Sequence, residues 1–346
     1  MTFTLAVDAM GGDFGPRVTF QAAQRILAER SDLSIQYYIS QTEQPWLESE
    51  ISKLASASHN SEFSDIQSRF SIHYCEQSVD MTDKPSHALR RKQKSTMALA
   101  LKSIANNETQ ACVSCGNTGA LLALSRYTLS TLIAIDRPAM ARDLPTAGKP
   151  LLMLDLGANI DAGADGLYQF AILSAAWRKA QGIKKPKLGL LNIGKEACKG
   201  TEEIQLAGQM ISKIDGIEYV GFVEADELYQ GQLDIVVCDG FHGNIALKTS
   251  EGLLRHVSQQ FDLILQSSLF GKALSFFTNP VIARFKRRLD PVLHSGALLL
   301  GINGLVIKSH GKSDEEAFYH SIRYTLTEIE RGTAQKLNDE MDMLSS

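Results

Sequence analysis

The sequence has few of the features that mark disulfide-stapled, nucleic-acid-binding or membrane-spanning proteins. Its 346 residues include five cysteines, two tryptophans and nine prolines, and the formal net charge is −4. An odd and small number of cysteines argues against a disulfide framework, so we expect reduced thiols. The weak negative charge argues against nucleic-acid binding, and no apolar run reaches the roughly 18 residues of a membrane span. Because the first residues read as a strand rather than a signal peptide, we expect a cytoplasmic protein.

Signatures of nucleotide, hydrolase and metal sites are also missing from the sequence. No GxGxxG follows the first expected strand, and residues 243–249 lack the glycine that a P-loop has before its lysine. No GxSxG or HExxH occurs, and no second CxxC or histidine pair completes a zinc site. Cys112 and Cys115 form a CxxC that we interpret as two buried thiols, with a redox pair as the alternative. We expect neither a cofactor nor a metal ion.

Short apolar runs alternate with helical patterns along most of the chain. The expected strands are residues 5–7, 35–39, 70–74, 111–114, 151–154, 188–191, 219–223 and 233–237. This alternation predicts one α/β domain, 1–346, with a doubly wound, Rossmann-like α/β/α sandwich. Residues 133–142 are expected to contain a loop at 136–139. A Gly-interrupted apolar run at 297–308 precedes a final helix that we expect to open with a capping pattern from Ser313 to Glu316.

Glycine accompanied by aspartate or asparagine follows several of these runs, at the point where each strand ends. The carboxyl ends of parallel strands meet at one sheet edge, beside helix N-termini that attract negative charge, so we expect one shared anion site. In the alternative, each such residue only caps a helix or fixes a turn. The candidate binding residues are Asp8, Gly11, Gly12, Asp13, Gly116, Asn117, Thr118, Gly119, Asn159, Asn192, Asp239, Gly240, Gly243 and Asn244.

Two further segments indicate contact surfaces. Arg90, Arg91 and Lys92 open a helix or helix pair at 87–105, and they form either a solvated face or a docking patch for an acidic partner or phosphate. Residues 253–292 contain no convincing strand and read as amphipathic helices that end in a basic cluster. This helical excursion fits an interfacial membrane anchor, dimer packing, or both.

Several motifs, ordered along nearly the whole chain, resemble those of the bacterial phosphate acyltransferase family. They are DAMGGD (8–13), CGNTGAL (115–121), DRPA (136–139), LDLGAN (154–159), LLNIG (190–194) with KGT (199–201), VVCDGFHGNIALKTSEG (236–252) and LLLGINGLVIKSHG (298–311). The resemblance implies transfer of a fatty acyl group from acyl-acyl carrier protein to inorganic phosphate, giving acyl phosphate for glycerophospholipid synthesis. It also implies a homodimer related to phosphotransacetylases and isocitrate-dehydrogenase-like folds, with no nucleotide or metal requirement.

The sequence departs from the family pattern at three places. Cys115 stands where the family usually has alanine, His242 where a small or aliphatic residue is common, and 293–297 (LHSGA) where a Tyr-Gly-Gly-Ala-Pro-like run is typical. The first two departures argue against Cys115 as a nucleophile and His242 as a base.

The family reaction uses phosphate itself as the nucleophile, so the protein must hold a dianion and stabilise an oxyanion. We expect Lys199, on a Gly-flanked loop, to neutralise charge, and Asn117 to donate hydrogen bonds. Asp239 is the expected acid, base or orienting carboxylate, with Asp8 and Asp13 as competitors. The basic segment from Arg90 would steer acidic acyl carrier protein.

Two functions of other classes fit the same fold class. One is a β-decarboxylating dehydrogenase-like enzyme, which should carry an acidic metal cluster. The other is a non-catalytic peripheral membrane scaffold. A phosphate-dependent acyl transfer assay separates both from the acyltransferase.

Overall fold

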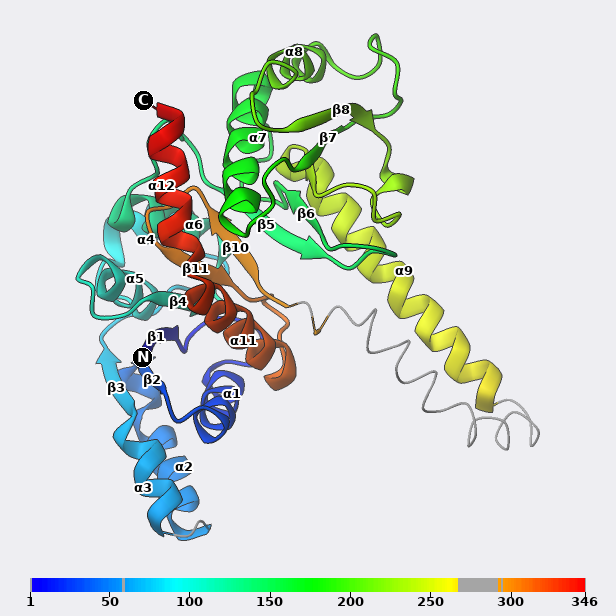
Figure 1. The fold of residues 1–346 in the computed structure, drawn as a ribbon. Coiled ribbons are helices and arrows are strands. Elements are labelled where there is room, and N and C mark those ends of the chain that lie inside the picture. Colours follow the sequence, from blue (N-terminus) through cyan, green and yellow to red (C-terminus); the bar gives the residue numbers. More distant parts are fainter. Residues whose placement is uncertain (1, 58–59, 267–291, 294, 346) are drawn as a thin grey trace.

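The computed structural model describes residues 2–57, 60–266, 292–293 and 295–345, which form an α/β structure around one sheet (Figure 1). The strands are β1 (Phe3–Asp8), β2 (Leu33–Ser40), β3 (Phe70–Cys75), β4 (Ala111–Ser114), β5 (Ala139–Leu144), β6 (Leu151–Leu154), β7 (Lys187–Leu191), β8 (Glu218–Val223), β9 (Ile235–Val237), β10 (Ala297–Leu300) and β11 (Leu305–Lys308). The helices are α1 (Pro16–Glu29), α2 (Gln44–Ala57), α3 (Asn60–Ser68), α4 (Pro85–Arg91), α5 (Thr96–Ala105), α6 (Thr118–Leu129), α7 (Gly163–Ala180), α8 (Glu202–Ile211), α9 (Gly240–Gln266), α11 (Glu315–Arg331) and α12 (Thr333–Ser345), with short 3-10 turns η1 (Gln41–Glu43) and η2 (Ala225–Glu227).

The sheet consists of two parallel blocks that run in opposite directions. Its strand order is β3-β2-β1-β4-β11-β10-β5-β6-β9-β7-β8. The first five strands are mutually parallel, and so are the last four. Between them, β10 is antiparallel to both β11 and β5, and β5 is antiparallel to β6. Three antiparallel pairings reverse the direction, so the carboxyl ends of the two blocks lie at opposite edges. The expectation of one edge shared by all these strand ends is therefore wrong.

Helices cover both faces of the sheet, and alternate strand residues divide the core between them. Leu5 and Val7 of β1 face a cluster that includes Phe20 of α1, together with residues of α7, α8, α11 and α12. Ala6, between them, faces the opposite cluster, formed with α5 and α6. Leu247 of α9 packs on that second side farther along the sheet. The doubly wound α/β/α class is thus confirmed, with a mixed sheet at its centre.

Three local expectations differ from the structure. Residues 139–142, where no strand was expected, belong to β5, which pairs with β10 and β6 on its two sides and lies at the reversal point. The last long helix, α11, is capped by Asp314 rather than Ser313, since the Asp314 carboxylate accepts a hydrogen bond from the Ala317 amide at 2.9 Å. The Ser-rich composition near 57–64 predicts a loop, but residues 60–64 belong to α3.

The expected helical excursion at 253–292 begins as a continuation of α9. This helix projects from the body of the molecule (Figure 1), and its described part ends at Gln266. Residues 267–291 lie outside the described residues. Among the described helices, none is both long enough and apolar enough to cross a bilayer.

Candidate functional site

The loops after β1, β4 and β11 meet at the carboxyl edge of the first block. Gly11 has φ +98°, and a Cβ there would lie 2.4 Å from Gly116 Cα. Gly12 has φ +73°, and a Cβ there would lie 2.9 Å from the Gly311 carbonyl oxygen. Asp13 donates its amide to that same carbonyl at 2.7 Å. Glycine is required because the backbones are in direct contact, and the structure brings these predicted residues together.

Asp8 ends β1 with its carboxylate buried among these loops. It is 1% exposed and accepts a hydrogen bond from Ser114 Oγ at 2.6 Å. The same hydroxyl accepts the Gly116 amide at 3.1 Å. Burial raises the pKa of Asp8 to about 6, although its hydrogen bonds and the charge of Lys308 oppose the shift. Asp8 therefore titrates near neutral pH and organises the loop after β4.

Lys308 ends β11 and supplies a buried positive charge at the same edge. Its side chain donates to the carbonyl oxygens of Cys115, at 3.3 Å, and of Ser309. Burial lowers the pKa of Lys308 to about 8, against the attraction of Asp8. Burial also raises the pKa of the neighbouring Cys115 thiol to about 12. The thiol is thus protonated at neutral pH, which agrees with excluding Cys115 as a nucleophile.

Helix α9 begins at the opposite edge of the sheet and carries charged side chains back toward this site. Lys248 Nζ lies 2.8 Å from His310 Nε2, in the loop after β11. Glu251, one turn on, pairs with Lys248 at 2.9 Å and with Arg142 of β5 at 3.1 Å. Burial, followed by the charge of Lys248, lowers the pKa of His310. Basic groups predominate here, so this region is suited to an anion.

The second block has its own buried carboxylate, Asp155, directly after β6. It accepts the backbone amides of Met140 at 2.9 Å and Asn159 at 2.6 Å, besides those of Gly157 and Ala158. Asn159 Nδ2 donates both to Asp155 and to the Pro138 carbonyl oxygen, each at 2.9 Å. Burial raises the pKa of Asp155. Asn159 therefore holds this loop in place, and both of its amide hydrogens are already used.

The polar sequence DGFHGN at 239–244 predicts a loop, but Asp239 directly precedes α9 and residues 240–244 form the start of this helix. A Cβ on Gly240 would lie 2.6 Å from the Asn159 carbonyl oxygen, and a Cβ on Gly243 would lie 1.9 Å from that of Asp155. The Asn244 side chain borders Gly157. Both glycines therefore let the first turn of α9 pack directly on the loop after β6.

The Asp239 carboxylate at this helix start is engaged with His242. It accepts the His242 amide at 2.8 Å and lies 2.7 Å from His242 Nδ1. Asp239 thus satisfies an otherwise unpaired amide of the first turn and also orients the imidazole.

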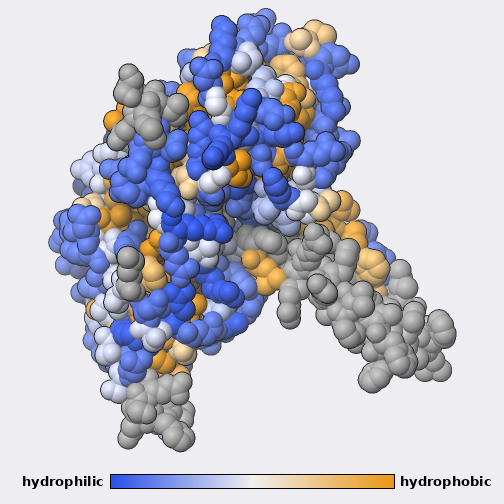
Figure 2. All heavy atoms as spheres, in the orientation of Figure 1, coloured by the Kyte–Doolittle hydropathy of each residue, from blue (hydrophilic) through white to orange (hydrophobic). Residues whose placement is uncertain are grey.

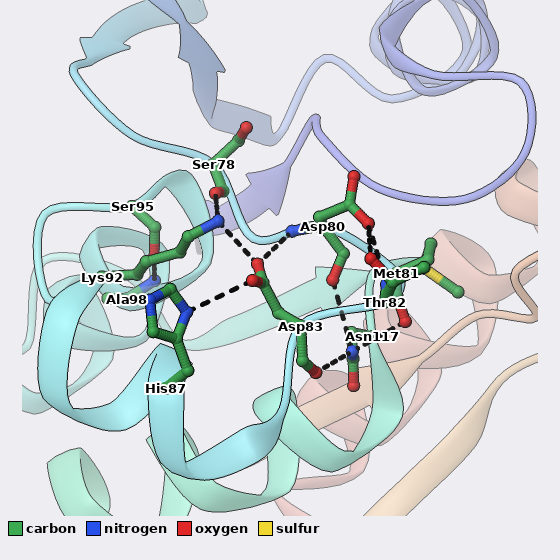
Figure 3. Close-up of polar contacts among 10 residues, drawn as sticks. All are labelled: Ser78, Asp80, Met81, Thr82, Asp83, His87, Lys92, Ser95, Ala98 and Asn117. Carbon is green, nitrogen blue, oxygen red and sulfur yellow. Dashed lines mark hydrogen bonds and ion pairs between the residues drawn. The ribbon is translucent and has the colours of Figure 1, made fainter.

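Asn117 occupies the N-cap of α6, where Thr118 begins the helix (Figure 3). Its Oδ1 accepts the Ala120 amide at 3.0 Å, and its Nδ2 donates to the carbonyl oxygens of Met81 and Asp83, each at 2.9 Å. The whole amide is engaged, so the geometry gives Asn117 a positioning role in place of the expected donation to substrate. A Cβ on Gly119 would lie 2.7 Å from Pro85 Cγ, so this residue serves close packing.

The loop after β7 is tied by Asn192 and leaves Lys199 exposed. Asn192 Nδ2 donates to the Lys199 carbonyl oxygen at 3.1 Å, and its Oδ1 accepts the Ile193 amide at 2.9 Å. A Cβ on Gly200 would lie 2.4 Å from Asn192 Oδ1. Asn192 therefore fixes the loop, while the Lys199 side chain extends from it into solvent.

The three basic residues of the expected docking segment have different environments. Lys92 donates to Asp83 at 2.6 Å and to the Ser78 carbonyl oxygen at 2.9 Å (Figure 3). It thus fixes the loop before α4. Arg90 and Arg91, in the last turn of α4, are exposed. Only these two arginines keep their charge available for a partner.

Sequence comparison decides between the alternatives. The model of a family described as fatty acid synthesis protein matches residues 3–336. The phosphate acyltransferase of Nitrosococcus oceani is 43% identical over 343 residues, which cover 99% of this chain and 97% of that protein. The chain belongs to the phosphate acyltransferase family. The member from Ectopseudomonas mendocina is 39% identical over 340 residues, 98% of each chain. Family membership favours an acyltransferase over the dehydrogenase-like and scaffold alternatives.

Solved structures of proteins outside the phosphate acyltransferase family share this fold. A phosphotransacetylase from Streptococcus pyogenes matches with a TM-score of 0.61 and 15% identity, covering 97% of this chain and 94% of that one. A putative 4-hydroxythreonine-4-phosphate dehydrogenase from Salmonella typhimurium matches with a TM-score of 0.55 and 13% identity, covering 94% and 99%. At such identities the likeness concerns the fold alone.

The basic residues of the site lie inside motifs that carried the family resemblance, yet sequence reasoning did not select them. Lys308 and His310 belong to LLLGINGLVIKSHG, and Lys248 and Glu251 to VVCDGFHGNIALKTSEG. The available signal was a lysine that ends an apolar run, a position that places a charge at a strand's carboxyl end. Arg142 carried no signal, because it lies outside these motifs and no strand was expected at 139–144.

Proposed function

We propose that this member of the phosphate acyltransferase family transfers a fatty acyl group from acyl-acyl carrier protein to inorganic phosphate, giving acyl phosphate for glycerophospholipid synthesis. The observation that carries the proposal is the group of basic side chains Lys248, Lys308 and Arg142 beside Gly-rich strand ends. Such a group suits a phosphate dianion. The buried Cys115 thiol is protonated at neutral pH, which fits a reaction whose nucleophile is phosphate itself.

In the proposed step, an oxygen of hydrogen phosphate attacks the thioester carbonyl carbon and forms a tetrahedral oxyanion. Collapse of this intermediate breaks the carbon–sulfur bond, and the proton of hydrogen phosphate ends on the departing thiolate. The products are acyl phosphate and the free thiol of the carrier. Backbone amides of the loops at Gly11, Gly12 and Gly116 are proposed to bind phosphate or oxyanion oxygens.

Lys199 and Asp239 retain proposed roles at the second block. The exposed Lys199 lies on a loop bounded by Gly194 and Gly200 at the opposite sheet edge, and we propose that it neutralises negative charge on a bound substrate there. Asp239 directly precedes α9 and contacts His242, and we propose that it orients a reacting group at the same edge. Loss of one backbone donor to the oxyanion at the first block would cost about 3 kcal/mol in transition-state stabilisation.

The direct test incubates the purified protein with long-chain acyl-acyl carrier protein and phosphate, and traps acyl phosphate with hydroxylamine. The expected result is a hydroxamate whose amount depends on phosphate. A matched reaction without phosphate corrects for direct attack of hydroxylamine on the thioester. A hydroxamate yield that phosphate does not raise would reject the proposed function.

Arg91→Glu is expected to weaken the use of acyl carrier protein. Arg90 and Arg91 are exposed on α4, so reversing one charge should raise the KM for acyl-acyl carrier protein about tenfold at low salt and less at high salt. The KM for phosphate should stay within about twofold. Lys102→Glu, an equal charge change on exposed α5, serves as the control. Equal effects of the two substitutions would contradict docking at α4.

We further propose that α9 mediates homodimerisation and peripheral membrane contact. Leu253 and Leu263 are each 61% exposed, Val257 lies between them, and Figure 2 shows apolar surface on this projecting helix. An apolar helix face of this kind is unfavourable in water, and a second copy or a lipid surface would cover it. The basic cluster at 284–288, which completed the expected anchor, lies outside the described residues.

Leu253→Glu is expected to shift the protein toward monomer in sedimentation experiments and to reduce its flotation with anionic vesicles. Placing a carboxylate on the apolar face removes burial of about 2 kcal/mol per copy and adds repulsion. Gln259→Glu, on an already exposed polar position of the same helix, should change neither property. Unchanged association of Leu253→Glu in both assays would remove α9 from these roles.

A further inference from the structure

The contact between Lys248 and His310 joins two hydrogen-bond donors. The Lys312 amide donates to His310 Nδ1 at 3.0 Å, so Nδ1 acts as an acceptor. A neutral imidazole carries a single N–H, and with Nδ1 accepting, that hydrogen lies on Nε2. Nε2 in turn is 2.8 Å from Lys248 Nζ. An ammonium group offers hydrogens only, so neither atom can accept from the other.

The surrounding side chains hold the two donors in this position. Glu251 accepts a hydrogen bond from Lys248 at 2.9 Å and is itself only 12% exposed, with Arg142 on its other side. The Lys248 side chain is 41% exposed, so solutes reach it from solvent. His310 follows Lys308 and Ser309, whose buried backbone fixes where the imidazole starts. The two donor groups thus lie side by side where solvent reaches them.

We propose that an oxygen of inorganic phosphate binds beside Lys248 Nζ and His310 Nε2, within reach of both, and accepts hydrogen bonds from Nζ and from Nε2–H. An anionic oxygen replaces the unfavourable donor–donor contact with two charge-assisted hydrogen bonds. The identity of the anion as the nucleophilic substrate rests on the proposed function. The site lies at the carboxyl edge of the first block, beside the Gly-rich loops.

The charge of the neighbourhood favours a dianion over a monoanion. Lys248, Lys308 and Arg142 contribute three positive charges, and Glu251 offsets one of them. Asp8, buried behind Lys308, lowers the excess further when it is ionised. The remaining positive charge is concentrated where burial of Lys308 and Arg142 limits screening by solvent. Doubly charged phosphate gains more from this field than a carboxylate does.

Direct binding of inorganic phosphate to the full chain, measured by calorimetry, tests the site without any acyl donor. Lys248→Met and His310→Phe should each raise the Kd for phosphate about tenfold to a hundredfold, as loss of a hydrogen bond to a charged group predicts. Lys312→Met removes an equal charge from the same loop, and its side chain is exposed, so its Kd should match the wild type. Melting curves identify any variant that fails to fold.

Nitrogen-15 spectra of histidine-labelled protein give a readout that does not depend on stability. The signal of His310, identified by its loss in His310→Gln, should show the proton on Nε2, and phosphate should shift that signal while leaving His242 in place. A proton on Nδ1, or a His310 signal that phosphate does not shift, overturns the proposal. So does unchanged phosphate affinity in both Lys248→Met and His310→Phe.

The hydroxylamine assay separates this proposal from the proposed function. If wild-type protein forms no acyl phosphate, but binds phosphate and loses affinity as expected in the two variants, the phosphate site is supported and the acyl transfer is rejected. If wild-type protein is active but both variants bind phosphate with wild-type affinity, the acyl transfer is supported and the phosphate site is rejected.

Discussion

Gly243→Ala is expected to lower the free energy of unfolding by at least about 3 kcal/mol and to abolish acyl phosphate formation. Gly243 lies in the first turn of α9, where an added Cβ would sit 1.9 Å from the Asp155 carbonyl oxygen and 2.8 Å from Cys238 Sγ. The carbonyl belongs to the backbone and cannot rotate away. The helix must therefore move, and with it Lys248 and Glu251, which it carries toward His310.

Gly252→Ala is the matched control on the same helix. Among the described residues, apart from its chain neighbours and the adjacent backbone of its own helix, no heavy atom lies within 4 Å of an added Cβ, so only the helix propensity changes. Because alanine is the better helix former, this variant should gain about 1 kcal/mol and keep full activity. Chemical denaturation of both variants measures the difference. Similar stabilities for the two would show that the start of α9 tolerates displacement from the loop after β6.

The rate constant kcat/KM for acyl-acyl carrier protein, compared at equal concentrations of the phosphate dianion, is expected to follow a bell-shaped pH profile with limbs near pH 6 and pH 8. Asp8 has a pKa of about 6 and Lys308 of about 8, so between these values both carry charge and hold the loops after β4 and β11. Outside them, activity should fall about tenfold per pH unit. Asp8→Asn should remove the acid limb at the cost of lower activity, and Lys308→Met should do the same for the basic limb. A flat profile from pH 5 to 9 would contradict the role of both residues.

At both limbs, the free energy of unfolding is expected to rise through these two residues where activity falls. This difference makes the test specific. The folded pKa of Asp8 lies above its ordinary value of 3.8, so ionisation is less favourable in the folded state. Lowering the pH from above 6 toward 3.8 therefore stabilises the fold through Asp8. The folded pKa of Lys308 lies below 10.5, so raising the pH from about 8 to 10.5 also stabilises it. Activity lost at either limb through these residues thus cannot be explained by unfolding.

Much of the sheet could be predicted from apolar patterning. The expected strands at 111–114 and 151–154 coincide with β4 and β6, because a strand buried on both faces is a continuous apolar run with clear ends. β5 was missed because its sequence, AMARDL, contains two charged residues, Arg142 and Asp143, which pair with side chains of α9 and α7. The reversal of strand direction was also missed, since a strand's residue pattern does not encode whether its neighbour is parallel.

The site could be predicted where the backbone imposes a residue type and not where distant side chains meet. Gly11 and Gly12 were expected at the edge and are required there by close backbone contacts. Asn117 and Asn159 were expected to bind substrate, with a purely structural role as the alternative. Their contacts fit the alternative, because Asn117 caps α6 and Asn159 holds the loop after β6. The contact of Lys248 with His310 spans 62 residues and depends on how α9 crosses the sheet. No local pattern contains that information.

The position of β11 sets an order for folding during synthesis. β4 pairs with β1 on one side and with β11, residues 305–308, on the other, so its second edge stays open until residue 308 has left the ribosome. The unpaired edge of a strand that is buried in the folded protein is prone to join the wrong partner. Any truncation before residue 305 leaves the first block with this edge exposed, and chaperone dependence and aggregation of such nascent fragments follow from the sheet order itself.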